Sequence, residues 1–358
     1  MELAIQKYLR SGKTPENITS EYDIHVKRHG IYPNLALFKY GIDTPMSEQL
    51  SREARGIILD ESRNWEVVCY AYDRFFNHYE GLAAEIDWST AKVLEKIDGS
   101  LCTIWYYEGK WNVSTSGTPD ALGDVGDFGF TFKDLFWTIW QECGYFLPKL
   151  HLTDYCFMFE MVSKYNRIIC RYDSAKIVLH GVRNRVTLQE HEPEEFAKDY
   201  GWQVVKAYPL QNLKEIIAFA QTLDPIEHEG FVVVDKFFRR QKIKSPQYVA
   251  LANIRGGLST KRLIELVRMG ESDEFLAYFP EFTKEYEEVK EKYETLVSEI
   301  ANTFAKYSPI IAQKDYALAV KHLPYSGILF QLRKDPGKTV KELLAESRLE
   351  YVCELLEH

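Results

Sequence analysis

The segment Lys96-Ile97-Asp98-Gly99-Ser100 decides how the rest of this sequence is interpreted. It follows the mixed run 92–95 and precedes the apolar run 101–106, so one interpretation is a β-hairpin with an Asp-Gly turn. The same turn can hold a nucleophilic amine against a ligand, because Gly99 lets the backbone approach closely. The motif alone favours the hairpin, so other residues must show whether Lys96 is also a nucleophile.

The composition limits the domain count and the class of protein. A chain of 358 residues exceeds the usual size of one core, so we expect one larger and one smaller domain. A net charge of −9 excludes a uniformly basic nucleic-acid coat. A local basic stripe could still hold a phosphodiester backbone.

Cysteine usage and hydropathy suggest a cellular location. The six cysteines form no Cys-x-x-Cys pair and no Cys/His cluster at zinc spacing. We find no charged-then-apolar leader and no apolar run of about 20 residues, the length of a membrane helix. We therefore expect a soluble cytoplasmic protein (host cytoplasm if viral), without a membrane partner or an obligate protein partner.

The hydrophobic periodicity predicts an α+β domain over 1–250 and a helical domain over 251–358, with the change of character after Gly256-Gly257. In the second domain, apolar residues from Phe282 to Phe304 recur every three or four positions, which indicates a helix face buried in a core rather than a base-stacking surface. The predicted strands of the first domain are 55–60, 65–70, 93–97, 101–107, 155–162, 176–182 and 231–235, and its predicted helices are 132–143 and 213–222, the second capped by Asn212.

A nucleophilic Lys96 requires help, because a lysine near its reference pKa of about 10.4 is almost always charged at pH 7. In the run 239–244 a period of two places Lys242 and Lys244 on one strand face, where they suit a phosphate. We expect their charge to favour neutral Lys96. The alternative is a solvated edge strand with protective lysines.

Two glutamates lie next to or within apolar runs. Glu229 precedes the run 230–234, where it could orient a metal-bound water or accept a hydrogen bond from a lysine. Glu160 is a lone acid within 158–162, where burial without a partner is costly. Its alternative is a strand-face glutamate that points to solvent.

Together these segments resemble the covalent nucleotidyltransferase superfamily, and most closely its phage-type RNA ligase 1 family. The resemblance implies an ATP-grasp-like ligase domain of antiparallel sheets with flanking helices, followed by an all-helical C-terminal domain that selects the RNA. Seven collinear segments carry it: 52–60, 74–77, 96–101, 159–160 with 166–169, 179–184, 229–234 and 242–245.

The resemblance implies that Lys96 attacks the α-phosphorus of ATP, while Lys242 and Lys244 neutralise the phosphate. It also implies Mg²⁺ or Mn²⁺ as a cofactor, with Glu229 tied either to Lys96 or to the hydrated ion. The implied ATP or AMP contacts are Arg55, Arg74 and Gly99, with Glu160 at the ribose, His180 and Val232 at the adenine, and Glu229 at Lys96. Two positions depart from the family: Arg74 replaces a usual lysine, and Ser116 lies in a segment that carries lysines in some relatives.

The expected activity is that of an ATP-dependent RNA ligase, which joins RNA 5′-phosphate and 3′-hydroxyl ends through lysyl-AMP and adenylated RNA. Single-stranded RNA and nicked tRNA loops are the expected substrates, as in RNA repair. One alternative is a DNA ligase or a GTP-dependent capping enzyme of the same superfamily. Another is a non-catalytic RNA-binding protein with backbone contacts at Lys164, Arg167, Arg171, Lys236, Arg239 and Arg240.

Overall fold

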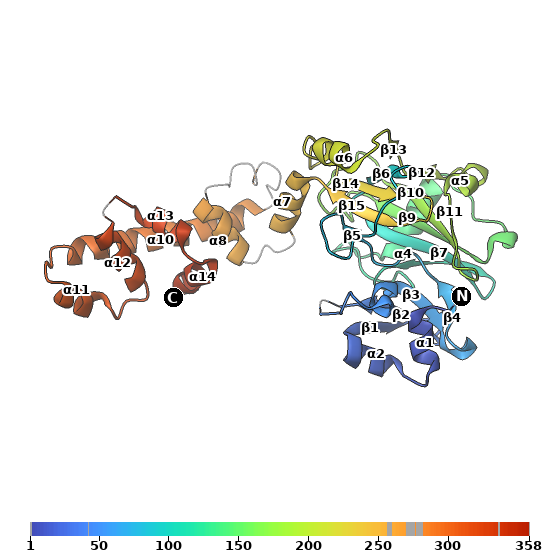
Figure 1. The fold of residues 1–358 in the computed structure, drawn as a ribbon, viewed down its shortest axis with the longest axis horizontal. Coiled ribbons are helices and arrows are strands. Elements are labelled where there is room, and N and C mark those ends of the chain that lie inside the picture. Colours follow the sequence, from blue (N-terminus) through green and yellow to red (C-terminus); the bar gives the residue numbers. More distant parts are fainter. Residues whose placement is uncertain are drawn as a thin grey trace. The chain divides into compact units, whose positions relative to one another are not determined.

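The computed structural model describes residues 2–41, 43–255, 260–269, 276, 282–335 and 337–357. The chain divides into two compact units, Met1–Ala250 and Leu251–His358 (Figure 1). The first unit contains three mainly antiparallel sheets with flanking helices, and the second is helical where it is described, so the predicted α+β fold class is confirmed. The Gly256-Gly257 break lies outside the described residues.

The first sheet lies between a helical layer and the central sheet. Side chains alternate along its strands, so Phe38 and Leu59 pack with the N-terminal helices while Leu37 and Ile58 pack with Trp105 of the central sheet. The strands follow the order β1 (Ile24–Arg28), β2 (Leu35–Tyr40), β3 (Arg55–Asp60) and β4 (Glu66–Cys69), and the helices are α1 (Ala4–Arg10), α2 (Pro15–Tyr22), α3 (Gln49–Glu53) and the 3-10 turn η1 (Glu61–Arg63).

The central sheet has the order β11-β10-β9-β7-β8, with β12 parallel to β10. Its second face packs on α4, where Phe136 and Trp140 contact the rings of Phe159 and Trp202. The elements are β7 (Ser100–Tyr107), β8 (Lys110–Thr115), α4 (Phe132–Glu142), η2 (Leu150–Leu152), β9 (Tyr155–Val162), β10 (Lys176–Asn184), β11 (Glu190–His191), α5 (Glu194–Tyr200) and β12 (Gln203–Val204).

The third sheet has the order β13-β6-β14-β15-β5, with β5 parallel to β15. Helix α6 packs Ile216 against Phe231 and Ile243, and the side chain of Asn212 caps its first turn as predicted. The elements are β5 (Phe76–Asn77), β6 (Lys92–Lys96), β13 (Ala207–Tyr208), α6 (Leu213–Ala220), β14 (Gly230–Val234), β15 (Arg240–Lys244) and α7 (Pro246–Arg255).

The hairpin interpretation of the Asp98-Gly99 turn is wrong. Strand β6 pairs with β13 and β14, whereas β7 pairs with β8 and β9, so the turn carries the chain from one sheet to another. The buried carboxylate of Asp98 holds the turn, because it accepts hydrogen bonds from the backbone N–H groups of Ile169 and Cys170 and from the Tyr248 hydroxyl. These long-range bonds decide against a hairpin.

The second unit forms its own core around α10. Tyr286, Val289, Tyr293, Leu296 and Ile300 are buried along one face of this helix, which confirms the predicted core role of the apolar stripe. The described helices are α8 (Thr260–Met269), α10 (Thr283–Tyr307), α11 (Gln313–Val320), α12 (Ser326–Lys334), α13 (Val340–Glu346) and α14 (Leu349–Glu357). No described helix is both long enough and apolar enough to cross a bilayer.

Candidate active site

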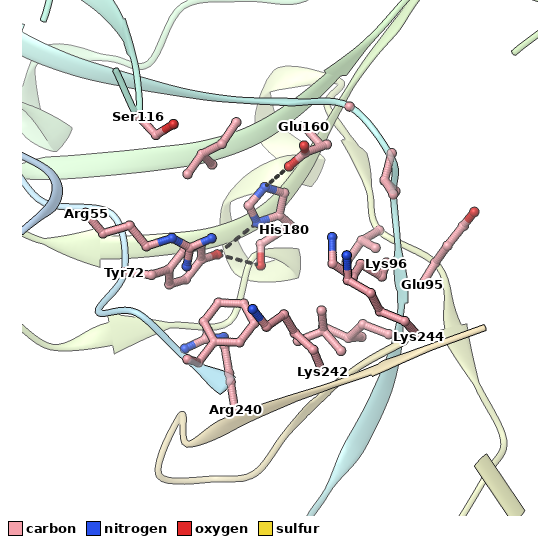
Figure 2. A pocket seen from close by; sticks show the side chains of 17 residues that line it. Arg55, Tyr72, Glu95, Lys96, Ser116, Glu160, His180, Arg240, Lys242 and Lys244 are labelled. Atoms are coloured by element: carbon pink, nitrogen blue, oxygen red, sulfur yellow. Dashed lines mark hydrogen bonds and ion pairs between the residues drawn. The ribbon is translucent and has the colours of Figure 1, made fainter. Parts of the chain in front are cut away.

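A cavity of about 320 Å³ lies in the first unit, where the central and third sheets meet at the Asp98-Gly99 turn (Figure 2). Its volume is in the range of small-molecule sites, about 300–1,000 Å³. One part of its wall is cationic and another is apolar. Its lining residues are Arg55, Tyr72, Phe75, Leu94, Glu95, Lys96, Ile97, Gly99, Leu101, Ser116, Glu160, His180, Val205, Val232, Arg240, Lys242 and Lys244.

Strand pairing brings Lys96 and Lys244 together. Gly230 of β14 is the partner of Lys96 on one side and of Lys244 on the other, so the two lysines flank one backbone position. Glu229, directly before Gly230, bridges them, with Oε2 2.6 Å from Lys96 Nζ and Oε1 2.8 Å from Lys244 Nζ. Gly230 has a φ of +141°, and an added Cβ would lie 2.3 Å from the carbonyl oxygen of Ile243, so only glycine fits.

The charges around the lysines differ from our expectation. Burial alone would lower the pKa of Lys96, but Glu229, Glu160 and Asp98 together raise it. The expectation that neighbouring cations favour neutral Lys96 is therefore wrong for this arrangement. Lys242 has the lowered pKa instead, at about 8, because it is buried close to Arg55, Lys96 and Lys244.

Glu160 and His180 of the central sheet and Tyr72 of the segment before β5 form a second polar cluster in the cavity wall. His180 Nε2 lies 3.4 Å from Glu160 Oε2, and His180 Nδ1 lies 2.9 Å from the Tyr72 hydroxyl (Figure 2). The Tyr72 ring stacks on His180 with a centroid distance of 5.7 Å. An added Cβ at Gly181 would lie 1.7 Å from the Tyr72 hydroxyl, so a glycine here makes room for the ring.

Two arginines complete the cationic wall. The Arg55 guanidinium lies over the Phe75 ring, 4.8 Å from its centroid, and the Arg240 guanidinium lies over the Tyr72 ring at 4.5 Å. Both nitrogens of the Arg240 fork bind Glu190, at 3.0 and 2.6 Å. This bidentate pair fixes Arg240 in one orientation.

The structure brings most of the predicted site residues together: Arg55, Lys96, Gly99, Glu160, His180, Val232, Lys242 and Lys244 line the cavity, and Glu229 bridges two of its lysines. Arg74 does not line it; its guanidinium lies over the rings of Tyr40 and Phe76. Sequence reasoning missed Tyr72 and Phe75 as lining residues, and considered Arg240 only as an RNA contact. The period of two through Lys242 and Lys244 also includes Arg240, so that signal was present.

The carboxylates of the cavity form no ready-made metal cage. Within the described ranges, no group of three or more His, Cys, Asp or Glu side chains is placed to hold an ion. Both oxygens of Glu229 lie within hydrogen-bond distance of an ammonium group, so a direct metal bond does not fit this carboxylate. The predicted contact through water stays a prediction. The cavity instead has the cations and apolar surface suited to a nucleotide phosphate and a base.

Comparison with known families agrees with this geometry. A phage-type family model described as RNA ligase matches residues 53–248, more than half of the 358 residues. The chain belongs to this RNA ligase family. Membership confirms the predicted family and identifies an RNA ligase enzyme, in preference to a DNA ligase or a capping enzyme.

Individual relatives of this RNA ligase carry similar names. The RNA ligase of Rhodothermus phage RM378 is 26% identical over 336 residues, which cover 76% of each chain. A candidate bifunctional polynucleotide kinase/RNA ligase of Autographa californica nuclear polyhedrosis virus is 28% identical over 93% of this chain, which spans only 50% of that protein. A solved archaeal ATP-dependent RNA ligase is 15% identical over 83% of each chain, with a TM-score of 0.49.

Proposed function

We propose that this RNA ligase is ATP-dependent and that Lys96 is its nucleophile. Lys96 Nζ forms a bond to the α-phosphorus of ATP as the bond to pyrophosphate breaks, and the amine loses its proton. One observation carries the proposal: Lys96 lines a cavity whose wall also includes Lys242, Lys244 and Arg55. Fixed cations are what a phosphoryl transfer needs, because catalysis consists mainly of positioning and charge stabilisation.

The rest of the cavity suits the nucleoside. Glu160 is a carboxylate beside His180, able to accept a hydrogen bond from a ribose hydroxyl. Leu94, Val205 and Val232 supply apolar surface for a purine, with His180 as a ring partner. A hydrated Mg²⁺ or Mn²⁺ ion would be held chiefly by the phosphates of ATP, which requires few protein ligands.

The later steps require RNA. AMP passes from Lys96 to an RNA 5′-phosphate, and an RNA 3′-hydroxyl then displaces AMP to form the phosphodiester bond. Single-stranded RNA or a nicked tRNA loop is the proposed substrate, and the helical unit is proposed to select it.

The decisive experiment follows the covalent adduct. Deadenylated protein is mixed with ATP and Mg²⁺ or Mn²⁺, and its intact mass is measured. We expect one AMP on the parent and none on Lys96→Ala or Lys96→Arg, since a guanidinium stays charged and is a poor nucleophile. An adduct on either variant would place the nucleophile elsewhere. A parallel incubation with labelled ATP or labelled GTP tests the nucleotide, and label retained from GTP but not from ATP would overturn the choice of ATP. In a separate reaction, a 5′-phosphorylated RNA oligomer tests whether the protein joins RNA ends.

A further inference from the structure

An exposed group of aromatic rings lies outside the cavity. Phe128, Phe130 and Tyr165 form a three-ring cluster, here called the aromatic platform. The centroid distances are 6.0 Å for Phe128–Phe130, 5.1 Å for Phe128–Tyr165 and 5.2 Å for Phe130–Tyr165. Phe128 remains 55% exposed and Tyr165 38% exposed. Apolar rings of this size are usually buried, so their common exposure calls for a binding partner.

The core of the central sheet holds the platform in place through Phe130. Phe130 packs against the core of the central sheet, its ring lies nearly parallel to that of Phe128 at an interplanar angle of 20°, and Tyr165 lies edge-on to both. The backbone N–H of Val125 donates to the carbonyl of Phe130, and buried Val125 anchors this turn. The rings therefore lose little conformational freedom when a flat ligand stacks on them.

Strand pairing places the loops that carry the platform at the same end of the central sheet as the Lys96 turn. Strand β7 begins at Ser100, directly after that turn, and runs antiparallel to both β8 and β9. The ends of β8 and β9 therefore lie beside the start of β7, where Cys102 pairs with Thr115 and Ser100 with Met161. The loop after β8 carries Phe128, and the loop after β9 carries Tyr165.

The second loop is tied to the turn and carries positive charge. Asn166 Nδ2 donates to Ser100 Oγ at 3.0 Å and to the Met161 carbonyl at 2.8 Å. The exposed Lys164 places its ammonium over the Tyr165 ring, 4.9 Å from the centroid. Cations and aromatic faces side by side are the combination that binds a single-stranded nucleic acid, with charge on the backbone and rings on the bases.

We propose that the aromatic platform stacks bases of the single-stranded RNA whose end is joined in the cavity. The inference extends the proposed function, because it presupposes that RNA ends react beside Lys96. Aromatic rings next to a lysine favour RNA over an apolar protein partner, whose contact surface would not require a cation. Stacking on rings tolerates any base, so this contact would bind RNA without reading its sequence.

The test measures RNA binding without ATP, and so does not depend on whether Lys96 becomes adenylated. The probe is a fluorescent single-stranded RNA with a 5′-phosphate, and a second probe has the same phosphates but abasic sugars. Phe128→Ala and Tyr165→Ala are each expected to weaken binding of the first probe about tenfold. Both should bind the abasic probe like the parent. The matched control is Phe146→Ala, which removes an exposed ring (70%) elsewhere.

Tyr165→Phe and Phe128→Tyr keep the rings and should bind RNA like the parent, which separates stacking from damage to the loops. Parent-like RNA binding by both alanine variants would overturn the proposal. Equal weakening on the base-containing and abasic probes would also overturn it, because the lost contact would then not be with bases. Failure of the lysyl-AMP measurement would leave this binding result unaffected, so the two proposals fail separately.

Discussion

At the scale of single residues, Glu229 controls the charge of the proposed nucleophile. It is buried and touches both Lys96 and Lys244, and it is the largest of the influences that raise the pKa of Lys96 against the effect of burial. Lys96 must lose a proton to attack. A phosphate group near Lys244 would compete with Glu229 for the Lys244 ammonium, and this competition links nucleotide binding to the charge state of Lys96.

Replacing Glu229 by Gln removes the negative charge and keeps the shape. The pKa of Lys96 should fall, since burial then acts with less opposition. We expect the pH of half-maximal lysyl-AMP formation to shift downward, measured by single-turnover mass spectrometry across pH. Glu192→Gln, which breaks the exposed pair with Lys92, is the control and should leave the profile unchanged. An unshifted Glu229→Gln profile would contradict this role.

Lys242 should make nucleotide binding depend on pH. Its pKa is about 8, so it is charged below that pH and neutral above it. Because ATP is an anion, its affinity should be high below pH 8 and fall above it, by up to about tenfold per pH unit. Calorimetric titration at several pH values would measure this fall. Lys242→Arg stays charged and should flatten the profile; an unchanged slope in that variant would assign the effect to another group.

At the scale of elements, glycines allow strands and turns to meet at the site. Gly99 lies against the end of β9, where an added Cβ would stand 2.5 Å from the Met161 carbonyl and 2.6 Å from Val162 Cγ1. The Lys96 turn can therefore pass from the third sheet to the central sheet only with a glycine here. Asp98 holds the same turn from the other side through its three hydrogen bonds.

Gly99→Ala should accordingly damage both the fold and the chemistry. Overpacking of this kind lowers the free energy of unfolding by about 1–3 kcal/mol, and displacement of the turn should abolish lysyl-AMP formation. Denaturant titration and intact mass measure the two effects. Gly81→Ala is the control, because a Cβ there meets nothing within 4 Å, and its unfolding free energy should stay within about 0.5 kcal/mol of the parent. A Gly99→Ala protein as stable and active as the parent would refute the close approach.

At the scale of the whole molecule, every cavity-lining residue lies between Arg55 and Lys244, within the first unit. Helix α7 also supports the site, because Tyr248 donates its hydroxyl to Asp98. A chain that ends at residue 255 keeps this helix. We expect it to form lysyl-AMP and to lose RNA joining, measured on a 5′-phosphorylated oligomer. Full joining by the shortened chain would remove the helical unit from the choice of substrate.

Local pattern was sufficient for much of the architecture and chemistry. The strands 55–60 and 155–162, the buried stripe of α10 and the shared face of Lys242 and Lys244 follow from periodicities of 2 and 3.6, which depend only on neighbours in the chain. Strand β1 was missed because only Ile24 is buried in it, and such an edge strand has little hydrophobic alternation.

Contacts between distant residues required the folded chain. Lys96 and Glu229 are 133 positions apart, and their meeting depends on β14 pairing with both β6 and β15. The stacking of Tyr72 on His180 likewise depends on how the sheets assemble. Strand β7 pairs with β9 and not with β6, and this pairing depends on the turn that Asp98 holds. Short segments of sequence are therefore enough to identify the reactive groups. They do not identify the charge states and partners of these groups, because burial and long-range pairing arise only when the sheets assemble.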